Sequence, residues 1–259
     1  MRLTVITTVY NRPDFLEIQA KLLKKNIIGD YQFIAVDDST DESITKELVS
    51  VCLNYDIFYI RKNFRGQNNT INEHHADSLN WIWQEVIKNI ISDDVVLILD
   101  SDMFLIEPFD FVDWMEQSVI SGVKQERPLP TDSTWTPNLE NKVEYPWVGI
   151  LFFNFTEMKK YIDEPNFQGG VVDSHRTDTG GNLYHFMKNN NLCLKEINVE
   201  YIDKIFDIDT FFVPFKFELY LNGKFFHYRA GSNWNGLSKQ EIHYKNLIFK
   251  EILKRIGVE

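Results

Sequence analysis

Cysteine and long apolar runs are both scarce in this chain of 259 residues. Its two cysteines, Cys52 and Cys193, stand in apolar, helix-like or strand-like surroundings. We therefore expect buried free thiols rather than a disulfide framework, which suits a reducing compartment. No run of about 18 apolar residues is present, and the strand-like residues 2–6 do not resemble a signal peptide. We expect a soluble, cytoplasmic protein without a transmembrane segment.

Positive charge is also in short supply. Lys and Arg number 27 against 38 Asp and Glu, which leaves a net charge of −11. Contacts with phosphate backbones need an excess of Lys and Arg, so broad adhesion to unmodified nucleic acid or to an anionic membrane is disfavoured. A local basic cleft stays open as an alternative. Aromatic residues make up 14% of the chain, which favours a well-packed globular fold.

Strand-like and helix-like stretches alternate through about the first 120 residues. Apolar strand patterns lie at residues 3–7, 33–36, 57–60 and 95–99. Right-handed crossovers through the helices between them would build a mostly parallel sheet covered on both faces. We expect a single α/β domain over residues 1–259, a three-layer sandwich. Its Rossmann-like half, residues 1–120, is of a nucleotide-binding type, and residues 121–259 are a more elaborated half.

Local patterns predict several single elements. Ser39, followed three residues later by Glu42, predicts a capping box that opens a helix. A period-3.6 apolar stripe predicts one helix over residues 72–91. Residues 122–145 are polar and contain prolines, which predicts a long loop. Residues 240–256 predict an amphipathic helix whose apolar stripe faces the core or a membrane, core packing being the commoner case.

Acidic residues follow the most apolar of the predicted strands. Asp100, Ser101 and Asp102 come directly after residues 95–99. Ligands of open α/β sheets bind at the carboxyl ends of strands, and two carboxylates two residues apart can share one hard cation. These residues are therefore a candidate metal site. The alternative is a solvated loop, since Asp-x-Asp alone is common.

Four stretches, in this order, resemble the glycosyltransferases of the GT-A fold, particularly the family 2-like group. They read Thr7-Thr8-Val9-Tyr10-Asn11-Arg12, Val36-Asp37-Asp38-Ser39-Thr40-Asp41, Asp100-Ser101-Asp102 and His227-Tyr228-Arg229. The resemblance implies a GT-A-like fold and a UDP-, GDP- or dTDP-sugar as donor. It also implies that residues 121–259 bind the acceptor and complete the metal site.

The resemblance places Thr8, Tyr10, Arg12, Asp37 and Asp38 around the nucleoside of the donor. The ring of Tyr10 offers a face for the base, and a carboxylate can accept the imide N–H of the base. For the two acids, helix capping is the alternative interpretation, and both roles can coexist.

The resemblance places Asp100, Ser101 and Asp102 at the donor diphosphate. Asp100 and Asp102 would hold Mn²⁺ or Mg²⁺ there, with the late His227 as a further metal ligand. Such a cation neutralises the charge of the leaving diphosphate. Arg229 is able to grip phosphate with two parallel hydrogen bonds. A structural role is the alternative for His227.

The second half departs from the family pattern. Family 2 enzymes usually carry an acid from a Glu-Asp-like pair at the start of a helix under the acceptor. Here Asp178, followed by Gly180 and Gly181, has the same setting, and the glycines would allow a substrate close to the backbone. Asp178 could take the proton of an acceptor hydroxyl, or could simply cap the helix. Asp173 is the second candidate base.

The resemblance implies a metal-dependent, inverting glycosyltransferase. Its acceptor could be a glycan, a lipid-linked sugar, a protein or a small molecule. One alternative is a non-catalytic nucleotide-sugar-binding module. Another is a phosphohydrolase of the haloacid dehalogenase type, but that family places its Asp-x-Asp motif on the first strand, whereas here the motif follows the fourth predicted strand.

Overall fold

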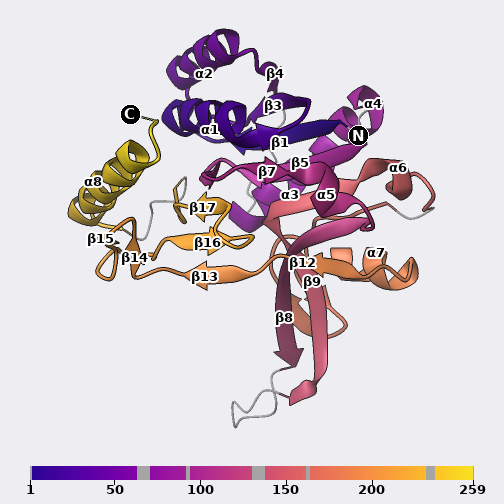
Figure 1. Cartoon of the computed structure of the whole chain (residues 1–259). Helices are drawn as coiled ribbons and strands as arrows, with labels where there is room; N and C mark the ends of the chain where they lie inside the picture. The colour runs from indigo at the N-terminus through magenta and orange to yellow at the C-terminus, as the bar shows by residue number, and fades with distance from the viewer. Residues whose placement is uncertain are drawn as a thin grey trace. The chain divides into compact units, whose positions relative to one another are not determined.

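The computed structural model describes residues 2–62, 71–91, 94–129, 138–161, 164–231 and 237–258. The fold is α/β with a mostly parallel central sheet, as the sequence predicts. Figure 1 shows the helices and strands of the chain, which divides into two compact units. Unit 1 consists of Met1–Val5, Lys62–Leu99 and Val112–Ile197, and unit 2 consists of Ile6–Arg61, Asp100–Phe111 and Asn198–Glu259. Each unit therefore combines segments that are far apart in sequence.

Unit 2 begins with strands and helices in the predicted alternation. They are β1 (Leu3–Val9), α1 (Pro13–Asn26), β3 (Tyr31–Asp37), α2 (Glu42–Tyr55) and β4 (Phe58–Arg61). The first three residues of β1 belong to unit 1. Most side chains of β1 and β3 are buried, and β3 pairs with β4 in parallel. Pro13 stands in the first turn of α1, where the missing N–H costs little. The three predicted strands are confirmed.

The predicted capping box at the start of α2 is wrong. The helix is capped by Asp41, whose Oδ1 accepts the Ser43 N–H at 2.8 Å. The hydroxyl of Ser39 accepts the N–H of Asn11 instead, at 2.9 Å. The Ser39 hydroxyl, which the local pattern assigned to the helix cap, therefore forms a contact between two loops instead.

An antiparallel sheet of order β13-β16-β17-β6 forms the second part of unit 2. Its strands are β13 (Val199–Tyr201), β16 (Glu218–Tyr220), β17 (Phe225–His227) and β6 (Met103–Leu105). Glu218 lies opposite His227, and His227 lies opposite Met103. Unit 2 also contains the parallel pair β2 (Ile27–Ile28) and β7 (Phe109–Asp110), and the antiparallel pair β14 (Lys204–Ile205) and β15 (Ile208–Asp209).

The last helix, α8 (Lys239–Arg255), packs its apolar face into the core of unit 2. Phe249 lies against the rings of Phe15, Phe104 and Phe226, and Ile252 is fully buried. Core packing is therefore confirmed for Ile252 and Ile256 of the predicted stripe, whereas Leu247 of that stripe is 52% exposed. Within the described residues, no helix combines the length and the apolar character needed to span a membrane.

Unit 1 is built on strands in the order β12-β8-β9-β5. They are β5 (Val95–Asp100), β8 (Ile120–Leu129), β9 (Asn138–Asn154) and β12 (Leu194–Glu196). β5 and β8 each pair with β9 in antiparallel fashion, whereas β12 pairs with β8 in parallel. All five apolar residues of β5 are buried, as predicted for a strand covered on both faces.

The predicted loop over residues 122–145 is wrong for most of its length. β8 and β9 pair from Ile120 opposite Phe153 out to Leu129 opposite Asn138. In the outer part Lys142 bridges Glu126 and Glu144, at 2.7 Å to each. The polar residues that suggested a loop therefore form ion pairs on a two-stranded ribbon. Residues 130–137 of the predicted loop lie outside the described residues.

The helix predicted over residues 72–91 is present as three consecutive pieces. They are α3 (Ile71–Trp81), the π-helix η1 (Ile82–Ile87) and α4 (Lys88–Ile90). Trp83 packs against Phe153, Phe155 and Phe167. The other helices of this part of the chain are short: α5 (Phe111–Met115), α6 (Phe155–Met158) and α7 (Leu183–Asn189). A hairpin of β10 (Gly170–Val172) and β11 (His175–Thr177) precedes α7.

Both cysteines are free thiols, and they differ in exposure. Cys52 is buried on α2, as expected. Cys193 is exposed, so its predicted burial is wrong. It lies in the turn between α7 and β12, outside the apolar core that its neighbours in sequence suggested.

Lys245, on the buried face of α8, allows a test of this packing. Its ammonium donates to the carbonyls of Pro214, Phe215 and Arg229, at 3.0, 2.6 and 2.9 Å. Lys245→Met keeps the apolar stem but leaves these acceptors without their donor, so the free energy of unfolding should fall by roughly 2–4 kcal/mol in urea denaturation. Lys250→Met, at an exposed position of the same helix, should change it by less than about 0.5 kcal/mol. Equal effects of the two substitutions would contradict this prediction.

Candidate functional site

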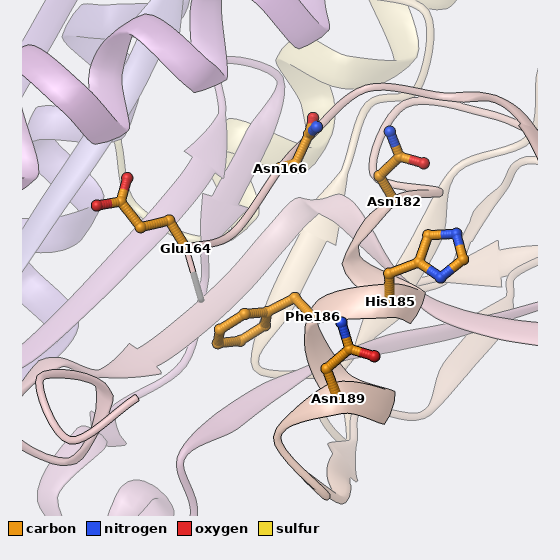
Figure 2. A pocket seen from close by; sticks show the side chains of 6 residues that line it. All are labelled: Glu164, Asn166, Asn182, His185, Phe186 and Asn189. Atoms are coloured by element: carbon orange, nitrogen blue, oxygen red, sulfur yellow. The ribbon is translucent and has the colours of Figure 1, made fainter. Parts of the chain in front are cut away.

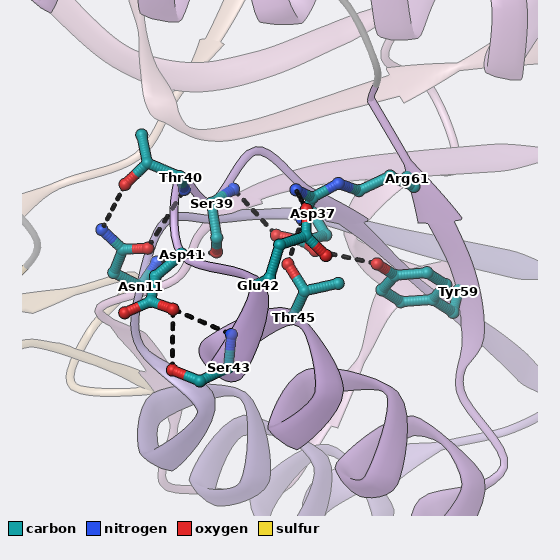
Figure 3. Close-up of polar contacts among 10 residues, drawn as sticks. All are labelled: Asn11, Asp37, Ser39, Thr40, Asp41, Glu42, Ser43, Thr45, Tyr59 and Arg61. Carbon is teal, nitrogen blue, oxygen red and sulfur yellow. Dashed lines mark hydrogen bonds and ion pairs between the residues drawn. The ribbon is translucent and has the colours of Figure 1, made fainter.

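Two loops of unit 2 are fastened together at the carboxyl ends of β1 and β3 (Figure 3). Asn11 has a left-handed backbone, with φ of 55°, and donates its N–H to Ser39 Oγ at 2.9 Å. Its side-chain amide exchanges hydrogen bonds with Thr40 at 3.3 Å. The N–H of Asp38 donates to the carbonyl of Val9 at 3.0 Å. The structure thus brings together the two loops to which the sequence assigns the nucleoside.

Asp37 anchors this corner of the fold. It is 1% exposed, and its Oδ1 accepts the Ser39 N–H at 2.8 Å. Its Oδ2 accepts the Tyr59 hydroxyl at 2.8 Å and an N–H of Arg61. Burial alone would raise the pKa of Asp37, but the donors from Ser39, Tyr59 and Arg61 outweigh it and lower the pKa. Both carboxylate oxygens therefore serve contacts within the protein.

Thr8, Tyr10 and Asp38 are the neighbours of this anchor. Thr8 is half-buried near the end of β1, and Tyr10 follows the strand and is 39% exposed. Asp38 is buried directly after β3. The solvent-exposed ring of Tyr10 therefore lies on the loop after β1. That loop is hydrogen-bonded to the loop that carries Asp38.

Arg12 is held from three sides. Its guanidinium makes two hydrogen bonds to Asp14, at 2.8 and 2.7 Å, and lies over the ring of Phe15, 3.2 Å from the centroid. A further N–H donates to the carbonyl of Gly231. Arg12 thus links the loop after β1 to the segment after β17.

Gly231 lies between Arg12 and Asp102. Its N–H donates to Asp102 Oδ2 at 2.8 Å, and its carbonyl accepts from Arg12. A Cβ at this position would lie 2.7 Å from Asp102 Cβ and closer still to the ring of Phe15. Only glycine therefore fits here without a shift of its neighbours. Residues 232–236, which follow, lie outside the described residues.

Asp102 and His227 come together from distant parts of the chain. They are 7% and 5% exposed, and Asp102 Oδ1 is 3.4 Å from His227 Nε2. Asp100 ends β5 with a half-buried side chain, its carbonyl accepts the Gln19 amide at 2.8 Å, and Ser101 is buried in the turn that follows. The structure thus joins two of the three predicted metal ligands. Among the residues described, no three His, Cys, Asp or Glu side chains form a metal-binding cluster.

Glu218 is a buried acid of this site that the sequence analysis misses. Its Oε2 is 2.8 Å from His227 Nδ1 and accepts the hydroxyl of Tyr220. Its Oε1 is 3.3 Å from the guanidinium of Arg229, the residue expected to grip phosphate. Burial would lower the pKa of His227, but the carboxylates of Asp102 and Glu218 outweigh it and raise the pKa to about 9. No motif surrounds Glu218, so the strand register alone reveals its role.

Asp178 lies in unit 1, in a turn ahead of α7. The helix begins at Leu183 with Asn182 as its N-cap residue, so the predicted position of Asp178 at a helix start, and with it the capping alternative, is wrong. The half-buried Asp178 accepts the N–H of Thr179 on Oδ1 at 2.8 Å. Its own N–H donates to the hydroxyl of Tyr145 at 3.0 Å.

The glycines after Asp178 are required by the turn itself. Gly180 has φ of 92°, and a Cβ there would lie 2.7 Å from Val148 Cγ1. A Cβ at Gly181 would overlap the side chain of Thr177. The packing of the protein therefore explains both glycines without a substrate.

Asp173, the second candidate base, lies in the turn between β10 and β11. Its backbone is left-handed, with φ of 45°, and its exposed carboxylate is 3.5 Å from the ammonium of Lys188. Asp173 and Asp178 both belong to unit 1, whereas the predicted donor residues belong to unit 2.

A polar cavity of about 310 Å³ opens in unit 1 (Figure 2). Its lining consists of three carboxamides, an imidazole, a carboxylate and one aromatic ring: Asn166, Asn182, Asn189, His185, Glu164 and Phe186. The carboxylate of Glu164 accepts hydrogen bonds from Gln84 and Lys88 at 2.6 Å each. Asn182, at the start of α7, lies in the same loop as Asp178.

The chain is similar to several solved structures of glycosyltransferases. No protein-family model matches the chain, and no curated protein matches it in sequence. The apo form of mouse xyloside xylosyltransferase 1 is 9% identical, with a TM-score of 0.45 over 76% of this chain and 85% of that one. The mannosyltransferase PcManGT from Pyrobaculum calidifontis, in complex with GDP-Man and Mn²⁺, is 15% identical, with a TM-score of 0.40 over 67% and 50%.

The galactosyltransferase LgtC, in complex with donor and acceptor sugar analogs, is 15% identical, with a TM-score of 0.37 over 61% of this chain and 60% of that one. The chain thus spans less than two thirds of the length of LgtC and of PcManGT. Because these TM-scores are below 0.5, the likenesses carry no argument about activity.

The Asp37–Arg61 pair predicts a distinct dependence of stability on pH. The folded-state pKa of Asp37 is below its usual value of 3.8. Its contribution to stability is therefore fully present above that value and is lost as the pH falls through the lower folded-state pKa. Asp37→Asn should reduce the free energy of unfolding at pH 7 by about 2–3 kcal/mol, less than for a fully buried pair because Arg61 is partly exposed.

Urea unfolding of both proteins at pH 7 and near pH 3 tests this prediction. The difference between the variant and the wild type should shrink in acid, because below its usual pKa Asp37 binds a proton more readily in the unfolded chain than in the folded protein. Asp30→Asn, which changes an exposed acid of the same unit, should have little effect at either pH. A difference that stayed constant down to pH 3 would show that the ionised form of Asp37 does not stabilise the fold.

Proposed function

We propose that the protein is a glycosyltransferase that moves a sugar from a nucleotide-diphosphate sugar to an acceptor hydroxyl, with Mn²⁺ or Mg²⁺ as cofactor. The observation that carries this proposal is the pairing of Asp102 with His227, 3.4 Å apart, directly after the buried strand β5. Gly231 joins Asp102 to Arg12 in the loop after β1. A candidate cation-binding pair is thus connected by hydrogen bonds to a candidate nucleoside loop.

The Asp102–His227 pair fits a shared divalent cation. Metal–ligand bonds of about 2.1 Å, at angles of roughly 90–110°, set two ligands about 3.0–3.4 Å apart. The observed distance from Oδ1 to Nε2 is 3.4 Å. An imidazole ligand favours Mn²⁺ over Mg²⁺, which prefers oxygen. Asp100 is the proposed third protein ligand, and the cation, when bound, would offset the charge of the leaving diphosphate.

Tyr10, Thr8 and Asp38 are proposed to bind the nucleoside. The exposed ring of Tyr10 can stack on a base. The hydroxyl of Thr8 and the carboxylate of Asp38 can bond to the base or the ribose. Asp37 would contribute by holding the turn that presents Asp38, since its own oxygens accept from Ser39, Tyr59 and Arg61.

The diphosphate is proposed to lie near Ser101 and two arginines. Arg12 is paired with Asp14, and Arg229 is paired with Glu218. In the donor complex, each guanidinium would therefore contact both the diphosphate and the acid that orients it. Such partly neutralised cations bind phosphate without leaving an unpaired charge when the donor departs.

Asp178 of unit 1 is the proposed general base. A carboxylate within hydrogen-bond reach of the acceptor hydroxyl can remove its proton as the sugar is transferred. Displacement helped by a single base inverts the anomeric configuration. Asp173 is the alternative base, although it is more exposed and faces Lys188. The proposed acceptor is a glycan, a lipid-linked sugar or a small molecule.

A non-catalytic nucleotide-sugar-binding module is the second candidate function. It would use the same residues of unit 2 and would not need Asp178. Donor binding without transfer or donor hydrolysis, over a broad acceptor panel, would favour the module. The phosphohydrolase alternative is disfavoured because the Asp-x-Asp motif follows β5 rather than β1.

A cytoplasmic location is part of the proposal. It is supported by the two free thiols, Cys52 and Cys193. Unpaired cysteines are typical of proteins in reducing compartments.

Calorimetry with UDP, GDP, CDP and dTDP, each with and without Mn²⁺, tests the donor site. We expect one diphosphate to bind, and to bind more tightly with Mn²⁺. Substituting a residue that only supports a metal ligand weakens metal binding by roughly 10–100-fold. Asp102→Ala removes a proposed ligand itself, so it should weaken the metal-dependent binding by at least as much. Asp30→Ala, which removes an exposed acid of the same unit, should leave it unchanged. The proposal loses its support if no diphosphate binds, or if binding ignores Mn²⁺ and survives Asp102→Ala.

Asp178→Asn tests the proposed base, because it keeps the size of the side chain and removes its basicity. Donor affinity should hold, and sugar transfer should fall by roughly 10²-fold or more, the usual contribution of a positioned base. Transfer is measured with the donor and the acceptor identified by screening, and the configuration of the product is read by NMR. Near-normal transfer by Asp178→Asn combined with loss in Asp173→Asn would move the role to Asp173. A product that keeps the configuration of the donor would refute the inverting mechanism.

A further inference from the structure

Glu218 and His227 occupy one row of the antiparallel sheet in unit 2. Glu218 in β16 lies directly opposite His227 in β17, and His227 lies opposite Met103 in β6. Directly opposed residues project from the same face of a sheet, so their side chains meet. Asp102 immediately precedes β6. The register therefore sets the imidazole of His227 between two carboxylates, Glu218 on one side and Asp102 on the other.

The contacts differ at the two nitrogens of the imidazole. Nδ1 is 2.8 Å from Glu218 Oε2, and Nε2 is 3.4 Å from Asp102 Oδ1. An ionised carboxylate only accepts hydrogen bonds, so a short contact with Glu218 requires a proton on Nδ1. A cation bound between His227 and Asp102 would displace the proton of Nε2, the nitrogen that faces Asp102, and would leave the Nδ1 proton with Glu218.

Glu218 is itself fixed in place. The hydroxyl of Tyr220 donates to Oε2, and the guanidinium of Arg229 lies 3.3 Å from Oε1. Glu218 is 4% exposed, so bulk water does not compete for these contacts. Tyr220, on its own strand, and Arg229, just after β17, hold the carboxylate in one orientation.

We propose that Glu218 is a positioning residue that keeps the proton of His227 on Nδ1 and turns Nε2 toward Asp102 as a metal-binding nitrogen. The metal-binding part of this inference rests on the proposed function, whereas the position of the proton does not. Carboxylate partners of this kind orient metal-binding histidines and raise their basicity.

Two substitutions of Glu218 separate the effect of its hydrogen-bond acceptor on His227 from the effect of its negative charge. Glu218→Gln keeps a carbonyl oxygen that can accept the Nδ1 proton, and Glu218→Leu keeps a similar size without any acceptor. Glu200→Leu is the matched control, because Glu200 is an exposed acid on β13, the strand that neighbours β16. Thermal unfolding establishes that each variant is folded.

Histidine-selective ¹⁵N NMR reads the proton directly, and His227→Gln identifies the resonance among the 6 histidines. We expect a slowly exchanging Nδ1–H in the wild type, in Glu218→Gln and in Glu200→Leu, and its loss or rapid exchange in Glu218→Leu. An unchanged Nδ1–H in Glu218→Leu overturns the proposal. If Glu218→Leu does not fold, the wild-type spectrum decides, since absence of a slowly exchanging Nδ1–H there overturns the proposal and its presence supports it.

Mn²⁺ titration followed by electron paramagnetic resonance, at saturating nucleotide, tests the consequence for the metal. Glu218→Leu should weaken Mn²⁺ binding by roughly 10–100-fold, and Glu218→Gln should weaken it much less. Equal Mn²⁺ affinity in the wild type and Glu218→Leu overturns the metal-binding part of the inference. If the wild type binds no Mn²⁺ while the NMR result holds, Glu218 still positions His227, and the proposed function fails instead.

Discussion

Buried ionisable groups need partners, and this requirement organises unit 2 around Asp102, His227 and Glu218. Removing one member of a buried charge pair costs several kcal/mol, because the remaining charge has lost its compensation. Here the compensation comes from distant parts of the chain: the hydrogen bond between Gly231 and Asp102 spans 129 residues of sequence. The pairing of β6 with β17 brings His227 beside Asp102, and the glycine at position 231 lets a backbone N–H reach the Asp102 carboxylate. The same row of side chains presents a carboxylate oxygen and an imidazole nitrogen at a spacing that suits one cation.

The polar groups of the loops after β1 and β3 hold the two loops together, beside the residues proposed to bind the nucleoside. Both carboxylate oxygens of Asp37 accept hydrogen bonds from within the protein, and Asn11 connects one loop to the other. These contacts leave Tyr10 exposed next to a firmly held turn. A rigid frame of this kind reduces the entropy lost when a ligand binds, which is how a small number of side chains can hold a nucleoside. Arg12 and Gly231 then connect that frame to Asp102.

Elements with a continuous apolar pattern could be predicted from the sequence. Elements that depend on contacts between distant residues could not. β5 could be predicted because five apolar residues precede Asp100. The cap at Ser39 could not be predicted correctly, since Asn11, from another loop, occupies its hydroxyl. The outer ribbon of β8 and β9 resembles a loop in sequence because its ion pairs, such as Lys142 with Glu126, form only between strands.

The residues of the candidate site differ in the same way: some could be predicted from the sequence, and others could not. Asp102 and His227 could be predicted from motifs and from the family resemblance, and they do come together. Glu218 could not, because a single acid between apolar and aromatic residues carries no local signal. Its partnership with His227 depends on the register of β16 with β17, which no periodicity in this short strand specifies.

The central claim is that Asp102 and His227 hold a divalent cation next to a nucleoside diphosphate. Crystals grown with Mn²⁺ and the diphosphate that binds, with data collected at the manganese absorption edge, test it most directly. The account predicts one anomalous peak within about 2.3 Å of both Asp102 Oδ1 and His227 Nε2, with diphosphate oxygens completing the coordination. A diphosphate bound at the loops after β1 and β3 with no manganese at this pair, or with manganese elsewhere, would contradict it.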